Sequence, residues 1–105
     1  MKASLKGANG ERELANILRE HGYEVMRGGS LSFGQRPDLY GLPGLHIEVK
    51  RVEKLNIVEA MTQAERDALR FNDGMPTVFH RRNRTPWLVT MRLEDFLQLY
   101  GRRDE

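Results

Sequence analysis

The chain has 105 residues, which is enough for one packed domain and too few for two independent ones. It contains no apolar run long enough to cross a membrane and no apolar N-terminal stretch of signal-peptide length, so we expect an intracellular protein without a membrane partner. Cysteine is absent, which excludes disulfides and thiolate metal sites and leaves oxygen or imidazole as the ligands for any metal.

The kind of charge is more informative than its size. Lysine and arginine exceed aspartate and glutamate by only 17 − 15 = +2, yet 13 of the 17 basic residues are arginine. A guanidinium group presents a planar fork of donors that matches a phosphate group, whereas a lysine ammonium acts as a hydrated point charge. Nucleic acid is therefore a reasonable partner, although 30% charged residues also fits an ordinary solvated surface.

The first predicted element is a helix from about Asn9 to His21, closed by Gly22. Its apolar stripe consists of Leu14, Ile17 and Leu18. Residues 23–27 (YEVMR) predict a short strand, and the glycine-containing stretch 28–34 predicts a loop. A short extended piece is expected at residues 37–40, because the residue before a proline avoids helical geometry.

Residues 45–52 (LHIEVKRV) form the clearest predicted strand, because apolar and polar residues alternate through it. One face carries Leu45, Ile47 and Val49, and the other carries His46, Glu48 and Lys50. A second helix is predicted from a capping-box pattern at Asn56 and Glu59 to about residue 73. Its apolar residues recur at steps of three and four: Ile57, Ala60, Met61, Ala64, Ala68 and Phe71.

The last third predicts a hairpin and a closing helix. Residues 77–81 (TVFHR) and 87–92 (WLVTMR) flank a turn-like RNRTP, and residues 93–100 (LEDFLQLY) read as a short helix. The whole order is helix, three strands, helix, two strands, helix. It predicts one α/β domain over residues 1–105, with a mixed central sheet flanked by helices, and we expect Phe79, Trp87 and Phe96 to pack in its core.

Two acids and a lysine form the candidate site. Glu48 and Lys50 leave the same face of their strand, an arrangement that is usually an exposed ion pair when it stands alone. Asp38 lies one turn upstream, and if the two segments pair as a hairpin its carboxylate converges on that of Glu48. Close like charges raise each other's pKa unless a cation neutralises them, so this pairing favours a divalent metal. Oxygen ligands suit Mg²⁺ or Mn²⁺.

A third acid, Glu11, lies beside the apolar stripe of the first helix, three and four residues before Leu14 and Ala15. Its position in the first predicted turn also fits a simple interaction with the helix dipole. With Glu11 in support, the chemistry that fits Asp38, Glu48 and Lys50 is hydrolysis of a phosphodiester. The metal would polarise the phosphate and its bound water, and Lys50 would orient the nucleophile or stabilise developing charge.

These residues also carry a resemblance to a known family. A Pro-Asp pair, nine residues and then Glu-Val-Lys resembles the signature of the PD-(D/E)XK nuclease superfamily, which implies a restriction-endonuclease-like core. Over nearly the whole chain the sequence is similar to the archaeal-type Holliday-junction resolvases and related small phage endonucleases. The matching stretches are KG-x-x-x-ERELA, HGYEVMRGGS, PDL, IEVKR, WLV and LEDF.

The resemblance implies roles for particular residues. It places Glu11, Asp38 and Glu48 in the metal site, adds the main-chain carbonyl of Val49 as a ligand, and makes Lys50 catalytic. It further implies DNA contacts or catalytic support from Arg12, Arg27 and Ser30. Gln63 matches a glutamine of another small branch, the VRR-type nucleases, and is a candidate supporting residue. The segment after Lys50 departs from the archaeal enzymes, which leaves the dimer geometry and the substrate class open.

Basic residues surround the candidate site in the sequence and predict a phosphate-binding rim of Lys6, Arg12, Arg27, Arg36 and Arg51. The three histidines have no metal-ligand spacing, so we expect structural roles for His21, His46 and His80, although His46 shares the face of Glu48. The stretch 28–34 matches neither G-x-x-x-x-G-K-[ST] nor G-x-G-x-x-G, and no nucleotide cofactor is expected.

The sequence therefore predicts a Mg²⁺- or Mn²⁺-dependent DNA endonuclease that acts on branched DNA such as a four-way junction. We also expect a homodimer, from the resemblance and because two symmetric cuts need two equivalent sites. Three alternatives stay open at this point: an endonuclease of a phage or mobile element that cuts flaps, nicks or duplex DNA; a non-catalytic DNA-binding module; and a metal-free protein-interaction domain.

Overall fold

The computed structural model describes residues 2–28 and 37–102, with side chains from residue 9 in the first stretch. Its elements follow the predicted order of helix, three strands, helix, two strands and helix. They are α1 (Lys2–Glu20), β1 (Met26–Arg27), β2 (Leu39–Tyr40), β3 (Leu45–Arg51), α2 (Ile57–Phe71), β4 (Met75–Arg81), β5 (Leu88–Met91) and α3 (Leu93–Gly101). No helix in the described ranges is long and apolar enough to cross a membrane.

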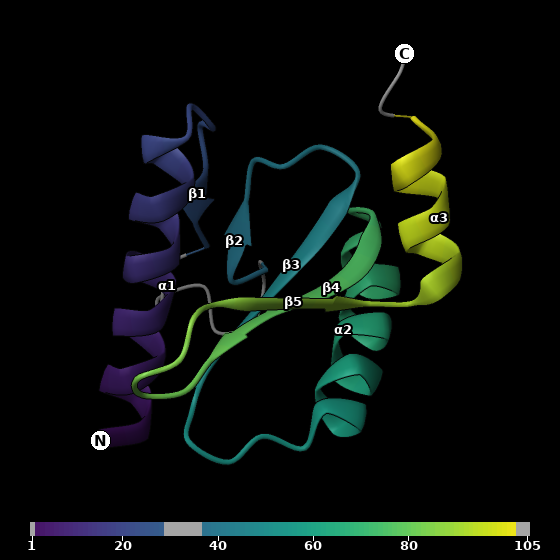
Figure 1. Cartoon of the computed structure of the whole chain (residues 1–105). Helices are drawn as coiled ribbons and strands as arrows, with labels where there is room; N and C mark the ends of the chain where they lie inside the picture. The colour runs from purple at the N-terminus through teal and green to yellow at the C-terminus, as the bar shows by residue number, and fades with distance from the viewer. Residues whose placement is uncertain (1, 29–36, 103–105) are drawn as a thin grey trace.

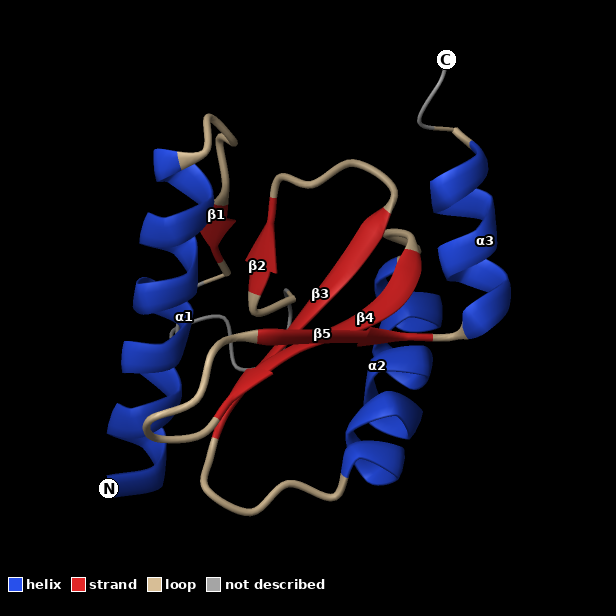
Figure 2. Ribbon diagram, viewed as in Figure 1, coloured by secondary structure: helices blue, strands red, loops and turns tan. Residues whose placement is uncertain are grey.

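The five strands form one mixed sheet in the order β1-β2-β3-β4-β5 (Figures 1 and 2). The β3 and β4 strands are parallel because α2 carries the chain from the end of one to the start of the other, and the other three pairs are antiparallel. The structure thus confirms the expected α/β class and mixed sheet. It also confirms the hairpin of β4 and β5 around the RNRTP turn.

Each face of β3 packs against a different helix. On the α1 side, Ile47 and Val49 lie in a core cluster with Leu14, Ala15 and Phe79. On the α2 side, the cluster consists of Ala60, Ala64 and Val78, and Val78 pairs with Glu48 across the parallel ladder. The polar face of β3 therefore points toward α2, and His46 and Glu48 are buried there.

Helix α1 begins seven residues earlier than the predicted Asn9, because the preceding residues include good helix formers such as Ala3, Leu5 and Lys6. Its C-terminus is as expected. Gly22 has a φ of +95°, its N–H donates to the carbonyl of Arg19, and the N–H of Tyr23 donates to the carbonyl of Leu18. This is a Schellman motif, which suits glycine because a Cβ disfavours positive φ.

Helix α2 also has the expected cap: the side chain of Asn56 accepts a hydrogen bond of 3.1 Å from the main-chain N–H of Glu59.

Other expectations were wrong in part. The strand predicted over residues 23–27 is reduced to Met26–Arg27, which pairs only with the two-residue β2. Trp87 is partly buried against the α1-side core, but Phe96 is 47% exposed on α3.

Candidate active site

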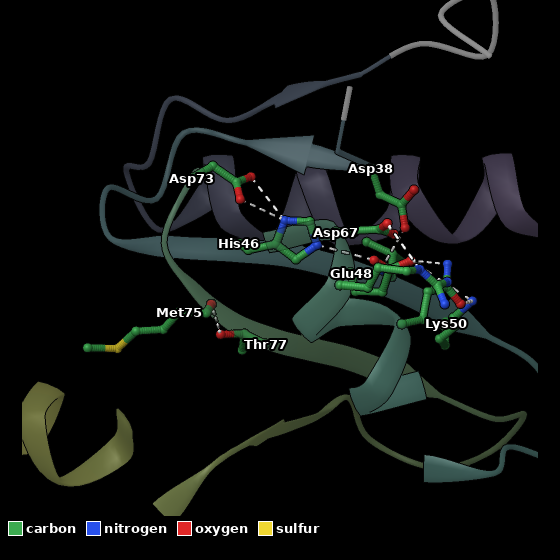
Figure 3. A network of polar contacts seen from close by, with 11 residues as sticks. Asp38, His46, Glu48, Lys50, Asp67, Asp73, Met75 and Thr77 are labelled. Carbon is green, nitrogen blue, oxygen red and sulfur yellow. Dashed lines mark hydrogen bonds and ion pairs between the residues drawn. The ribbon is translucent and has the colours of Figure 1, made fainter. Parts of the chain in front are cut away.

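The two acids predicted to converge lie on facing positions of neighbouring strands. Leu39 of β2 pairs with Ile47 of β3 in an antiparallel ladder, which sets Asp38 opposite Glu48. The carboxylate of Asp38 is fixed by the backbone of β3, because its Oδ2 accepts a hydrogen bond of 2.9 Å from the N–H of Val49. Figure 3 shows Asp38 above Glu48 and Lys50. The hairpin assumed from the sequence is thus present.

Burial and neighbouring negative charges raise the pKa of two acids of the candidate site, Asp38 and Glu11. Burial, together with the charges of Glu48 and Glu11, raises the pKa of Asp38 to about 7, against the opposing effects of the Val49 hydrogen bond and of Lys50. The pKa of Glu11 is also raised, by burial and by the charge of Glu48, although Arg27 opposes this. Glu11 on α1, Asp38 directly before β2 and Glu48 on β3 therefore lie close enough for their charges to interact, although their oxygens do not form a group of three within 4.8 Å.

Gln63 of α2 links the glutamate to the lysine. Its Nε2 donates to Glu48 Oε2 at 3.0 Å, and its Oε1 accepts from Lys50 Nζ at 3.0 Å. The Lys50 ammonium itself is 4.0 Å from Glu48 Oε2. Because an amide can donate and accept at once, Gln63 sets the relative positions of the carboxylate and the ammonium.

His46 holds the other oxygen of Glu48. Its Nε2 lies 3.2 Å from Glu48 Oε1, and its Nδ1 lies 2.9 Å and 3.0 Å from the two carboxylate oxygens of Asp73. Burial alone would lower the pKa of His46, but the hydrogen bonds and charges of Glu48 and Asp73 outweigh it and raise that pKa. The sequence shows that His46 and Glu48 share a face, but it carries no signal for Asp73, which is 27 residues further along the chain.

A second grouping of metal-type donors lies on the α2 side of Glu48. Donor atoms of His46, Glu48 and Asp67 lie within 4.8 Å of one another, the one such group of three among the residues that the structure describes. Glu48 belongs to this group and also faces Asp38. Its carboxylate is therefore the centre of the site, with acids on both sides.

The basic residues predicted to bind DNA have different surroundings. Arg27 is half-buried, with Nη2 3.4 Å from Glu11 Oε1, and Arg12 is exposed and donates to Asn9. Arg51 makes intramolecular contacts with three side chains, those of Glu13, Glu53 and Asn83. Ser30, Arg36 and the side chain of Lys6 lie outside the described residues.

Two comparisons with known proteins gave a match. The sequence model of the archaeal Holliday junction resolvase (Hjc) family matches residues 2–98, a range that includes every candidate site residue. Among solved structures, the chain is similar to Hjc of the archaeal hyperthermophile Archaeoglobus fulgidus, described as a Holliday junction resolvase. The TM-score is 0.58 at 25% identity, and the match covers 82% of this chain and 72% of that one. No curated protein matches.

Proposed function

The chain belongs to the archaeal Holliday junction resolvase family, and on that premise we propose that it is a single nuclease domain that hydrolyses phosphodiester bonds of four-way DNA junctions at Asp38, Glu48 and Lys50. The observation that carries this proposal is the facing position of Asp38 and Glu48 on β2 and β3, with Lys50 next to them. Glu11 completes the acidic site from α1.

The donor set fits a hard divalent cation. Asp38, Glu48 and Glu11 supply carboxylate oxygens, and the high pKa of Asp38 reflects burial and repulsion that a cation would relieve. We assign these side chains and the main-chain carbonyl of Val49 as ligands of Mg²⁺ or Mn²⁺. Such an ion would supply Lewis acidity at the scissile phosphate and lower the pKa of a water molecule there.

The remaining residues orient the reacting groups. Lys50 is 27% exposed, so its ammonium can reach a bound phosphate while Gln63 holds it beside Glu48. In that position it donates to the attacking water or to the phosphate oxygen on which negative charge develops. Gln63 acts through Glu48 and Lys50 and is therefore a positioning residue.

DNA contacts are assigned to basic and polar residues around the site. The exposed guanidinium of Arg12 lies one residue from Glu11 on α1, and Arg27 contacts Glu11 directly. Arg51 would have to leave its present acidic and amide partners to bind a phosphate. The proposed set is Lys6, Arg12, Arg27, Ser30, Arg36 and Arg51, and contacts of this type weaken as salt concentration rises.

A homodimer is supported by an apolar surface on α3 and β5. Asp95 is the one buried residue of α3, all of which is described, while Leu93, Phe96, Leu97 and Tyr100 are 47% to 69% exposed. On β5, Leu88 and Val89 are also exposed, and β5 is an edge strand of the sheet. Large exposed apolar patches usually mark an interface, and a second copy would provide the second cut of a symmetric junction.

The test is cleavage of a labelled four-way junction beside matched duplex and flap DNA, with and without Mg²⁺. Asp38→Asn and Glu48→Gln should each abolish paired junction cuts, while Glu20→Gln, at the exposed end of α1, should cut normally. If the protein cuts flap or duplex DNA in preference to the junction, the nuclease function stands and the junction is not its substrate. If the protein binds DNA tightly but makes no metal-dependent cut, it is a non-catalytic DNA-binding module and not a nuclease.

A further inference from the structure

The proposed reaction gives no role to the buried histidine next to Glu48. His46 is fully buried on β3, and both of its ring nitrogens lie within hydrogen-bond distance of carboxylate oxygens, Glu48 on one side and Asp73 on the other (Figure 3). A ring nitrogen that carries a proton can donate to the carboxylate oxygen that it faces. The imidazole therefore links the two acids.

The chain around Asp73 is shaped to make this contact. Asn72 caps α2 in the left-handed conformation, with φ 50° and ψ 48°, and Gly74 has a φ of +128°. A Cβ at Gly74 would lie 2.4 Å from the backbone of Gly44, so only glycine lets this turn pack against the start of β3. Phe71 then stacks on the imidazole, with ring centroids 6.1 Å apart. The turn, the ring and the strand together fix His46.

The consequence for Glu48 is that both of its oxygens are held. His46 contacts Oε1 at 3.2 Å and Gln63 donates to Oε2 at 3.0 Å, so rotation of the carboxylate is restricted. A carboxylate has about four acceptor positions, so each oxygen keeps capacity for a metal ion after these contacts. Glu48 is thus pre-oriented before any ion binds.

We propose that His46 and Asp73 are positioning residues that fix the Glu48 carboxylate for metal binding. The proposal rests on the proposed function, since it takes Glu48 as a metal ligand. Partners of this kind behind a ligand typically change metal affinity by about 10- to 100-fold. The expected effect is therefore on the concentration of metal required, more than on the rate once metal is saturating.

The test is calorimetric titration of the protein with Mn²⁺ in the absence of DNA, followed by junction cleavage as a function of Mn²⁺ concentration. His46→Leu removes both hydrogen bonds, and we expect its Mn²⁺ affinity to fall about 10- to 100-fold. The amide nitrogen of Gln in His46→Gln reaches about the position of Nε2, and we expect it to restore most of the loss. Asp73→Asn changes a side chain that is 25% exposed, and its Mn²⁺ affinity should lie between that of the natural protein and that of His46→Leu.

A control variant and a folding check accompany these measurements. His21→Gln changes an exposed histidine at the end of α1 and should match the natural protein. Thermal melts test whether each variant is folded. If His46→Leu does not fold, Asp73→Asn takes its place as the test variant. Mn²⁺ affinities of His46→Leu and Asp73→Asn equal to that of the natural protein would overturn the proposal. Equal losses in His46→Gln and His46→Leu would also overturn it, because His46 would then be a ligand itself.

Results with the natural protein distinguish a failure of the positioning role from a failure of the proposed nuclease function. If it binds Mn²⁺ and cuts the junction while the variants are unchanged, only the positioning role fails. If it neither binds Mn²⁺ nor cuts any DNA, the proposed nuclease function itself fails.

Discussion

Asp38 should make the metal-free protein less stable at alkaline pH. Its folded-state pKa of about 7 lies above the ordinary 3.8, so the folded protein holds this proton more tightly than the unfolded chain. The stability that the proton contributes is fully present below about pH 4 and is lost as the pH rises through about 7.

The first prediction is that Asp38→Asn stabilises the metal-free protein at pH 8 by about 2–4 kcal/mol, since each tenfold change in proton affinity is worth about 1.4 kcal/mol. Near pH 4 the difference should be small, because asparagine is neutral and can still accept from the N–H of Val49. Urea unfolding in a chelating buffer at the two pH values measures this. If Asp38→Asn is less stable than the natural protein at both pH values, the prediction is wrong. Added Mg²⁺ should stabilise only the natural protein.

Lys50 should act on the chemical step. Lys50→Met keeps the apolar stem and removes the ammonium beside Glu48, so we expect single-turnover junction cleavage to slow by about 100-fold or more. Junction affinity in Ca²⁺ should fall by less than about tenfold, because one cation among several contacts is lost. Lys54→Met, at an exposed position before α2, is the matched control. Equal effects of the two substitutions on cleavage would show that Lys50 has only a general electrostatic role.

The sequence predicted that Asp38 would converge on Glu48 and Lys50 on the condition that their segments pair as a hairpin, and the pairing of β2 with β3 meets that condition. Gln63 was singled out by its resemblance to a glutamine of the VRR-type nucleases, and the structure places it in contact with Glu48 and Lys50. Asp73 could not be predicted. It meets His46 only because α2 returns the chain to the start of β4, and no local pattern encodes that contact.

Helix α1 lies close to β3 at Gly10. A Cβ at Gly10 would lie 2.5 Å from the Cβ of Arg51, so the helix can lie this near the strand only with glycine there. Glu11 is the next residue along the helix. The approach therefore brings the third acid of the site to the sheet.

We predict that Gly10→Ala destabilises the fold by about 1–3 kcal/mol, as expected for overpacking, even though alanine favours helix. Displacement of α1 should also weaken Mn²⁺ binding through Glu11. Gly101→Ala is the control, since a Cβ there meets nothing within 4 Å. Denaturant unfolding and calorimetry of both variants measure the two effects, and a Gly10→Ala variant as stable as the natural protein would mean that α1 has room to move.

Sequence patterns predicted every helix and strand in the described part of the chain, but not all of their limits. Residues 2–8 extend α1 without an apolar stripe of their own, so the pattern gave no reason to begin the helix there. The alternation of β3 is real, yet its polar face is covered by α2 and buried with its histidine and glutamate. Sequence alternation reports which residues share a face and does not report what covers it.

The exposed face of α3 leads to a prediction about assembly. Leu97 is 55% exposed, so Leu97→Glu should be tolerated by the folded chain but not by an apolar interface. We expect light scattering to give twice the mass of one chain for the natural protein and a single-chain mass for the variant, with paired junction cuts replaced by single nicks. Val58→Glu, on a 72% exposed valine of α2, should remain a dimer. A natural protein that is monomeric at micromolar concentration would refute the interface.

The order of the elements and the family resemblance predicted the layered α/β architecture. It did not indicate that Phe96 and its neighbours would be exposed. Apolar side chains at helical spacing look the same in a sequence whether they pack on their own sheet or on another molecule, and only the structure separates the two.

The residues proposed for catalysis and those proposed for assembly lie in different stretches of this chain. Every side chain assigned to the chemistry, from Glu11 to Asp73, precedes β4, whereas the apolar face of α3 and β5 follows it. Substitutions that alter how two copies meet can therefore accumulate without touching the reacting groups. In the proposed homodimer the angle between the two copies sets the distance between their sites, so a change at the interface would change which DNA shape is cut while the chemistry stayed constant.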